Sequence, residues 1–199
     1  MFRVMLCAGI GPALGLVAMS AGAETMFLDG GYAELCAAAA YAAKDPNAKQ
    51  RFEITGSRLG LPPMEICDRA VNGYDGASEN VAESYNNRGV LWFMQTDLAA
   101  ALEDFRRAIR EQGSLAQAHV NLGYTLNALQ RWDEAIAALT RGIELGTDEA
   151  ARALFSRAIA HEERGQLRAA YDDYRRASEL EPEWEPPRVE LQRFRINQR

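Results

Sequence analysis

Residues 85–105, YNNRGVLWFMQTDLAAALEDF, contain a pattern of large and small residues that recurs twice further along the chain. The later copies are HVNLGYTLNALQRWDEAIAAL at residues 119–139 and LFSRAIAHEERGQLRAAYDDY at residues 154–174. The step from Gly89 to Gly123 is 34 residues, and the step from Gly123 to Ala158 is 35 residues. A repeat of this length predicts a solenoid, in which each unit buries its apolar face against its neighbours.

Each copy contains two helix-length segments, in which apolar residues recur at the spacing of an α-helix. The first segment carries a small residue, and an alanine follows 12 residues later; the three pairs are Gly89/Ala101, Gly123/Ala135 and Ala158/Ala170. A larger side chain at the first position would push the two helices apart, so we expect them to cross closely there. The bulky residues Phe105, Leu139 and Tyr174 are then expected to fill the space between repeats.

These features resemble the tetratricopeptide repeat (TPR), here of the exported bacterial type. The resemblance implies an all-α, helix-turn-helix solenoid with three repeats, at residues 82–115, 116–150 and 151–184. Residues 185–199 are expected to form a C-terminal capping helix, because Pro186-Pro187 precedes Val189, Leu191 and Phe194 at helical spacing.

Residues 1–23 have the pattern of a Sec-type signal peptide. Arg3 supplies a positive charge, an apolar stretch follows, and Ala21-Gly22-Ala23 is typical of a cleavage site that leaves Glu24 as the new N-terminus. The alternative is an uncleaved membrane anchor, which the glycines and the proline of this short stretch disfavour. We therefore expect a periplasmic or secreted bacterial protein with no stable membrane insertion after cleavage.

Residues 24–80 are expected to form an N-terminal helical cap and a linker, with helices at residues 31–43 and 63–72. Each of these helices carries one cysteine, Cys36 and Cys67. Two cysteines behind a signal peptide predict a disulfide that staples the helix pair. Closing a loop of this size is worth about 3–4 kcal/mol in the chain-entropy estimate. The alternative is a pair of reactive or metal-binding thiols.

The composition argues against several classes of function. The formal net charge is -6, whereas nucleic-acid binding requires a basic face. The sequence has no P-loop, dinucleotide-binding or metal-site signature, and its two histidines, His119 and His161, lie on apolar helical stripes. We therefore expect no enzymatic activity, no cofactor and no metal. An enzyme or metal-binder with an unrecognised site, near the cysteines if they stay reduced, is the alternative from another class.

What the resemblance does imply is a concave groove lined by the first helix of each repeat. The residues expected to face that groove and bind a partner are Asn86, Asn87, Val90, Phe93, Gln117, Asn121, Tyr124, Arg152, Phe155 and Ile159. Asn87 and Asn121 occupy equivalent positions and, with Arg152, resemble part of the clamp with which some TPR domains hold a peptide's C-terminal carboxylate. That clamp also uses lysines, which this chain lacks after Lys49. The two asparagines are equally compatible with a structural role, in which their amides bond to neighbouring helices.

The apolar members of this set predict a groove for a protein or peptide segment with apolar side chains. The function expected from the sequence is therefore a protein-protein interaction module, acting as an adaptor or scaffold. A periplasmic chaperone or envelope assembly factor with several clients is the alternative. The sequence leaves the oligomeric state open.

Overall fold

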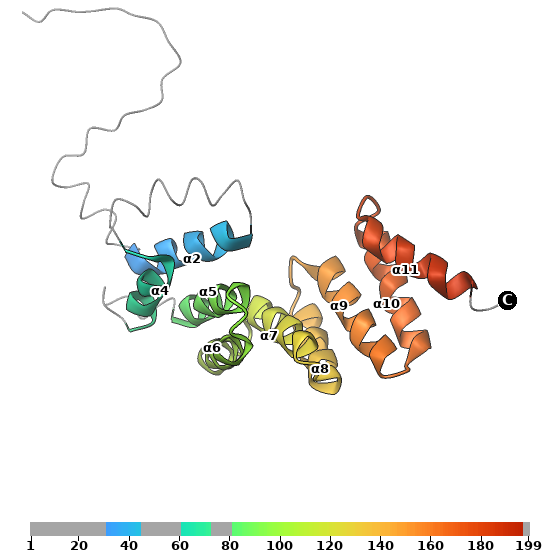
Figure 1. Cartoon of the computed structure of the whole chain (residues 1–199), viewed down its shortest axis with the longest axis horizontal. Helices are drawn as coiled ribbons and strands as arrows, with labels where there is room; N and C mark the ends of the chain where they lie inside the picture. The colour runs from blue at the N-terminus through green and yellow to red at the C-terminus, as the bar shows by residue number, and fades with distance from the viewer. Residues whose placement is uncertain (1–30, 45–60, 73–80, 197–199) are drawn as a thin grey trace, which may run out of the picture.

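The computed structural model describes residues 31–44, 61–72 and 81–196, and the regular structure in these ranges is helical (Figure 1). In chain order the helices are α2 (Gly31–Lys44), α4 (Pro63–Val71), α5 (Val81–Met94), α6 (Leu98–Glu111), α7 (Ala116–Ala128), α8 (Trp132–Glu144), α9 (Ala150–Glu163), α10 (Leu167–Leu180) and α11 (Glu185–Ile196). The predicted all-α solenoid is confirmed. The predicted signal peptide lies outside the described residues. No helix among those described is long and apolar enough to cross a membrane.

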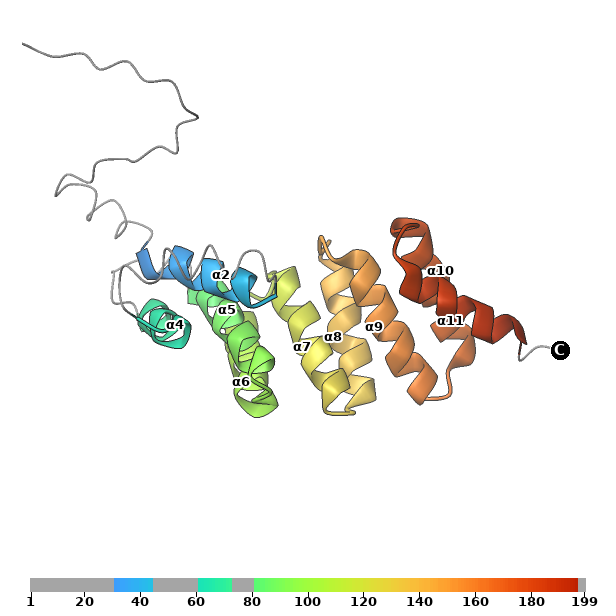
Figure 2. The same cartoon turned by 45° about the horizontal axis from the view of Figure 1, so that its top comes forward.

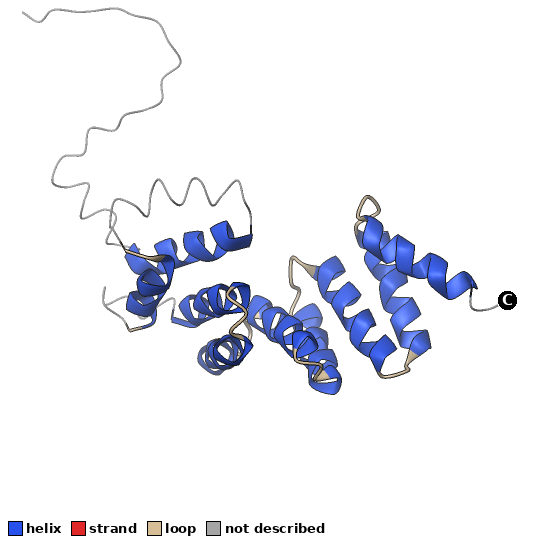
Figure 3. Ribbon diagram, in the orientation of Figure 1, coloured by secondary structure: helices blue, strands red, loops and turns tan. Residues whose placement is uncertain are grey.

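Three helical hairpins, α5/α6, α7/α8 and α9/α10, stand side by side along the array (Figure 2). Each turn contains one residue with positive φ, at equivalent positions: Thr96 (63°), Gln130 (57°) and Gly165 (71°). The next backbone N–H then bonds back to the first helix, as from Asp97 to the carbonyl of Trp92 at 3.0 Å. This arrangement satisfies carbonyls at the helix end and reverses the chain within a few residues (Figure 3).

The helices of a hairpin cross where the sequence predicts. A Cβ atom placed on Gly89 would lie 2.7 Å from Cε1 of Phe105, and one placed on Gly123 would lie 2.8 Å from Cδ2 of Leu139. Carbon atoms normally approach to about 3.5–4.0 Å, so neither position has room for a side chain. The close crossing thus depends on these glycines, as expected.

A buried ion pair joins the two helices of the first hairpin, and an equivalent pair joins the two helices of the third. Arg88 donates two hydrogen bonds to Asp104, at 2.7 and 2.8 Å, and Arg157 makes the same two bonds to Asp173. The equivalent residues of the middle hairpin are Leu122 and Ala138, which pack in one apolar cluster instead. The middle hairpin therefore differs chemically from its neighbours at this position.

The N-terminal helix pair is joined by the predicted disulfide. Cys36 of α2 and Cys67 of α4 are bonded, with their Cα atoms 4.8 Å apart. Both cysteines are buried in a cluster that also contains Ile66 and Leu91, so the pair packs directly on α5. The prediction of a disulfide-stapled cap is confirmed.

Helix α2 lies over α5, on the face of the array that α5, α7 and α9 form, which we call the inner face (Figure 2). Ala40 of α2 packs in one cluster with Val90 of α5. At the end of α2, Nζ of Lys44 lies 3.9 Å from Oε1 of Glu149, immediately before α9. Helix α2 therefore covers the part of the inner face that belongs to the first hairpin.

At the other end, α11 covers the last hairpin. Leu191 and Phe194 pack against Tyr174 and Ala158, and the rings of Phe194 and Tyr174 are 5.9 Å apart. The predicted capping helix is confirmed, although Val189, expected on its apolar stripe, is half exposed. Fewer side chains of α11 therefore pack on the third hairpin than its sequence suggests.

Candidate functional site

A pocket on the inner face brings together side chains from all three hairpins. It has a volume of about 400 Å³ and lies between α5, α7, the start of α8, α9 and the loop before α11. We call it the inner pocket; its lining residues are Phe93, Tyr124, Asn127, Trp132, Arg152, Phe155, Ser156, Ile159 and Trp184. Five of these nine residues are aromatic, so the pocket suits an apolar or aromatic side chain.

Phe155 and Trp184 form the wall nearest the C-terminus. Their ring centroids are 5.1 Å apart, and the Phe155 ring also lies 5.3 Å from that of Tyr174, which is buried beneath it. The loop holds Trp184 through a hydrogen bond from its backbone N–H to the carbonyl of Glu181, at 3.0 Å. This aromatic wall is therefore fixed from behind by the core of the third hairpin.

Charged groups at the edge of the pocket are already paired within the protein. Nη1 of Arg152 lies 3.6 Å from Oε1 of Glu181, and its guanidinium stacks over the Trp184 ring at 5.6 Å. The Tyr124 hydroxyl donates to Glu149 at 3.4 Å. Burial, and secondarily the nearby Glu149 carboxylate, raises the pKa of Tyr124 above its ordinary value. The hydroxyl therefore stays protonated at physiological pH and keeps its role as the donor to Glu149.

Comparison with known proteins agrees with this architecture. The family model for the tetratricopeptide repeat matches residues 93–148 and again residues 120–182. The chain is a tetratricopeptide repeat protein. No curated protein sequence matches it.

The TPR fold is also found in solved structures that resemble this chain. A MamA chain from Desulfovibrio magneticus RS-1, which runs from residue 41 to the end, is 18% identical, with a TM-score of 0.60, over 80% of this chain and 85% of that one. The TPR domain of Arabidopsis OM64 is 22% identical, with a TM-score of 0.56, over 58% of this chain and 95% of that domain. The second TPR domain of human RPAP3 is 26% identical, with a TM-score of 0.54, over 57% of this chain and 94% of that domain. Its structure contains the HSP70 peptide SGPTIEEVD.

Half of the groove residues predicted from the sequence meet in the inner pocket of this TPR protein. These are Phe93, Tyr124, Arg152, Phe155 and Ile159. They come from the first helix of each repeat, as the family resemblance implies. Their role in binding a partner stays a prediction.

The prediction was wrong about Asn86, Val90 and Asn121 as surface residues, because all three are buried. Ala40 of α2 packs with Val90, and Asn121 donates a hydrogen bond to Asn86 at 2.8 Å, between α7 and α5. An amide that bonds within the protein core is not accessible to a partner's carboxylate. The structural interpretation of the asparagines therefore holds for Asn121. This residue cannot take part in a clamp for a partner's carboxylate.

The two remaining predicted residues lie on the inner helices but outside the pocket lining. Asn87 is half-buried, and its side-chain oxygen accepts a bond from Asn86 at 3.4 Å. Gln117 lies at the start of α7, where its side-chain oxygen accepts from the Thr147 hydroxyl at 3.5 Å. Asn87 thus contacts a neighbour on its own helix, and Gln117 contacts the loop between α8 and α9.

Trp132 and Trp184 belong to the pocket but were missed from the sequence. Trp132 is the first residue of a second helix, and the family pattern assigns the groove to first helices. Trp184 lies in a loop between two prolines, where no helical period indicates which way a side chain points. A large aromatic residue in such a short loop was the one available signal.

The histidines make contacts that differ from simple core packing. His119 Nε2 lies 3.1 Å from the carbonyl of Gly113, and His161 Nδ1 lies 2.5 Å from Oε1 of Gln166. Both side chains are therefore partly exposed and contact polar groups, although they lie on apolar helical stripes in the sequence. Within the described ranges, no group of three or more histidine, cysteine, aspartate or glutamate side chains could hold a metal ion.

Proposed function

We propose that this chain is a protein-interaction module that binds a segment of a partner protein through its inner pocket. The observation that carries the proposal is the convergence of five aromatic side chains on one open pocket. Four of them come from the three hairpins, and one comes from the loop before α11. Tryptophan and tyrosine are enriched among residues that dominate binding energy, because they bury large areas with few rotatable bonds. The partner segment is expected to insert a bulky apolar side chain.

The charges at the pocket edge give the partner segment a second feature. Arg152 is half exposed, and the pairing with Glu181 at 3.6 Å is a surface ion pair, which contributes about 0–1 kcal/mol. A carboxylate on the partner can therefore replace Glu181 at small cost. The human RPAP3 domain, in complex with a peptide that ends in EEVD, supports a carboxylate-bearing partner segment by analogy.

We further propose that the module acts in the periplasm or outside the cell, as an adaptor or scaffold. The Ala21-Gly22-Ala23 pattern supports export. The Cys36–Cys67 disulfide supports an oxidising compartment, because such bonds persist there and are rare in the cytosol.

Mass spectrometry of the native protein from the envelope fraction tests the export proposal. The expected product starts at Glu24 and shifts by the mass of two hydrogens on reduction. Recovery of a chain that retains Met1 in the membrane fraction would contradict cleavage and would favour the anchor.

Peptide selection tests the binding proposal. Peptides selected from a phage-displayed library on the mature protein are expected to share a bulky apolar residue. Tyr124→Ala and Phe155→Ala are each expected to weaken the selected peptides by about 30-fold, because truncating an aromatic anchor costs about 2 kcal/mol. Fluorescence anisotropy measures the affinities, and thermal unfolding verifies that each variant stays folded.

Arg152→Ala separates the two features of the segment. It is expected to weaken only those peptides that carry a carboxylate next to the anchor, and its effect should fade as salt is raised. Selected peptides that bind both aromatic variants as tightly as wild type would show that the inner pocket is not the binding site. Weak binding of many peptides without a shared anchor would favour a chaperone with several clients.

A further inference from the structure

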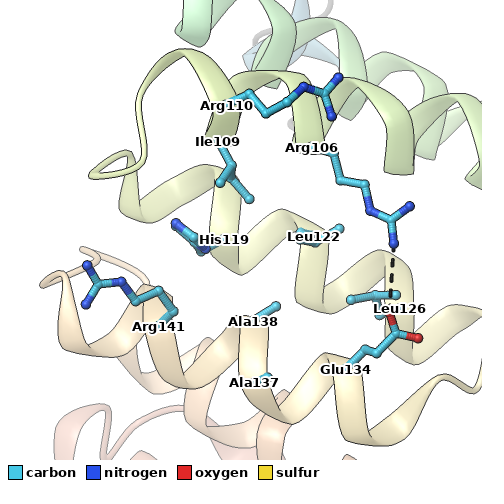
Figure 4. A pocket seen from close by; sticks show the side chains of 10 residues that line it. All are labelled: Arg106, Ile109, Arg110, His119, Leu122, Leu126, Glu134, Ala137, Ala138 and Arg141. Carbon is cyan, nitrogen blue, oxygen red and sulfur yellow. Dashed lines mark ion pairs between the residues drawn. The ribbon is translucent and has the colours of Figure 1, made fainter.

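A second groove lies on the opposite side of the middle hairpin, between α6, α7 and α8 (Figure 4). We call it the outer groove. It has a volume of about 530 Å³, and its floor is formed by Ile109, Leu122, Leu126, Ala137 and Ala138. Arg106 reaches from α6 toward Glu134 of α8, and Arg110 and Arg141 stand at the edges of the groove (Figure 4). None of these residues lines the inner pocket, so the two sites are separate.

The outer groove exists because the middle repeat lacks side chains that the other repeats carry there. Leu122 and Ala138 occupy the positions of the buried pairs Arg88–Asp104 and Arg157–Asp173. Ala137 likewise occupies the position of Glu103 and Asp172. Replacing two carboxylates by alanines and the paired arginine by leucine leaves a hollow with an apolar floor and one negative charge fewer.

The charges around the outer groove are unbalanced in favour of arginine. Glu103 is shared by Arg107 and Arg110, at 3.1 and 3.0 Å. Glu134 pairs with Arg131 at 2.6 Å and lies 3.8 Å from Arg106, and Arg141 lies 3.4 Å from Glu144. Five arginines thus share three carboxylates in this network, although the chain as a whole carries a net charge of -6.

We propose that the outer groove binds an acidic amphipathic segment of a partner protein. Its apolar side chains would cover the alanine and leucine floor, and its carboxylates would pair with Arg106, Arg110 and Arg141. The present pairs of these arginines are all at the surface, where an ion pair contributes little, so an incoming carboxylate can displace them. Guanidinium groups suit this purpose because they bind carboxylates through two parallel hydrogen bonds.

Two synthetic peptides provide the probe. The first is an amphipathic helix with leucines on one face and glutamates beside them, and the second carries glutamine at every glutamate position. Fluorescence anisotropy with the mature protein is expected to show binding of the glutamate peptide and at least about tenfold weaker binding of the glutamine peptide. The affinity of the glutamate peptide should fall as salt is raised. An overall acidic protein repels an acidic peptide at long range, so such binding reports the local arginines.

Two exposed substitutions test the position of the site. Ala137→Glu restores the carboxylate that the first repeat carries at this position, and Arg141→Glu reverses one charge of the rim. Each is expected to weaken the glutamate peptide by about tenfold. Arg176→Glu is the matched control, because Arg176 occupies the position of Arg141 in the next repeat, away from the groove. The control and Phe155→Ala are expected to bind the peptide like wild type.

Several outcomes would overturn the proposal. These are failure of the glutamate peptide to bind, equal binding of the glutamine peptide, or undiminished binding to both groove variants. Loss of binding in Phe155→Ala alone would assign the peptide to the inner pocket. If the protein is a dimer by light scattering, and Ala137→Glu makes it monomeric without affecting peptide binding, then the groove is occupied by a second copy of the chain.

Discussion

Gly123→Leu is expected to lower the free energy of unfolding by about 3 kcal/mol or more, because α7 and α8 touch at this residue. A single Cβ atom there would already lie 2.8 Å from Cδ2 of Leu139, which is itself fully buried. Because the Leu139 side chain is enclosed on all sides, a leucine at position 123 is expected to force the helices apart. Separation in the middle hairpin removes contacts with both neighbours, and in a solenoid each repeat depends on such contacts.

Thermal unfolding followed by circular dichroism measures this effect. For a chain of this size each kcal/mol lowers the midpoint by about 2–4 °C. Gly113→Leu is the control, because a Cβ atom at Gly113 meets only the carbonyl of Ile109 at 3.7 Å. We expect that variant to melt within about 2 °C of wild type. A Gly123→Leu protein with wild-type midpoint and helical signal would show that α7 and α8 do not cross at this glycine.

The fold could be predicted because its determinants recur along the sequence. The spacing from Gly89 to Gly123 to Ala158 sets the repeat, and the helix crossings follow from the need for small residues opposite Phe105, Leu139 and Tyr174. The disulfide could be predicted because only one pair of cysteines, Cys36 and Cys67, follows the predicted signal peptide. Such features depend on residue size and spacing, which the sequence records directly.

The candidate site was only half predictable, because its shape depends on segments outside the repeats. Nothing in the repeat pattern indicates that α2 covers Val90, or that Trp184 folds back onto Phe155. Burial of Asn121 also depends on how closely α7 approaches α5, where its amide meets Asn86. Contacts between distant segments decide which groove residues stay accessible, and a local period carries no information about them.

The middle repeat illustrates how a departure from the repeat pattern marks a surface. Its Leu122 and Ala138 are apolar residues within helix-length segments, and nothing in the sequence marks them as the site of a groove. In the structure they replace an ion pair found on both sides, and a groove opens at that point. The same replacement shows that the fold accepts either chemistry, which leads to a test of what the buried pairs contribute.

Arg157→Leu is expected to lower the free energy of unfolding by about 3 kcal/mol, because it leaves the carboxylate of Asp173 buried without its partner. Asp173 is 7% exposed and accepts bonds of 2.7 and 2.8 Å from Arg157. The remaining cation nearby is His161, whose Nε2 lies 3.9 Å from Asp173 Oδ2 and is charged only when protonated. Urea unfolding followed by circular dichroism measures the loss.

Adding Asp173→Ala to Arg157→Leu is expected to restore most of the lost stability, to within about 1 kcal/mol of wild type, because a buried ion pair and a well-packed apolar pair can be nearly equal in free energy. The middle repeat supplies the precedent, since Leu122 and Ala138 occupy these positions there. The two single variants and the double variant form a thermodynamic cycle, and we expect a coupling free energy of at least about 2 kcal/mol. If the double variant is instead as unstable as the sum of the two single losses, the pair does not act as a unit. The Leu/Ala packing of the middle repeat would then depend on its own surroundings rather than on the hairpin geometry that the three repeats share.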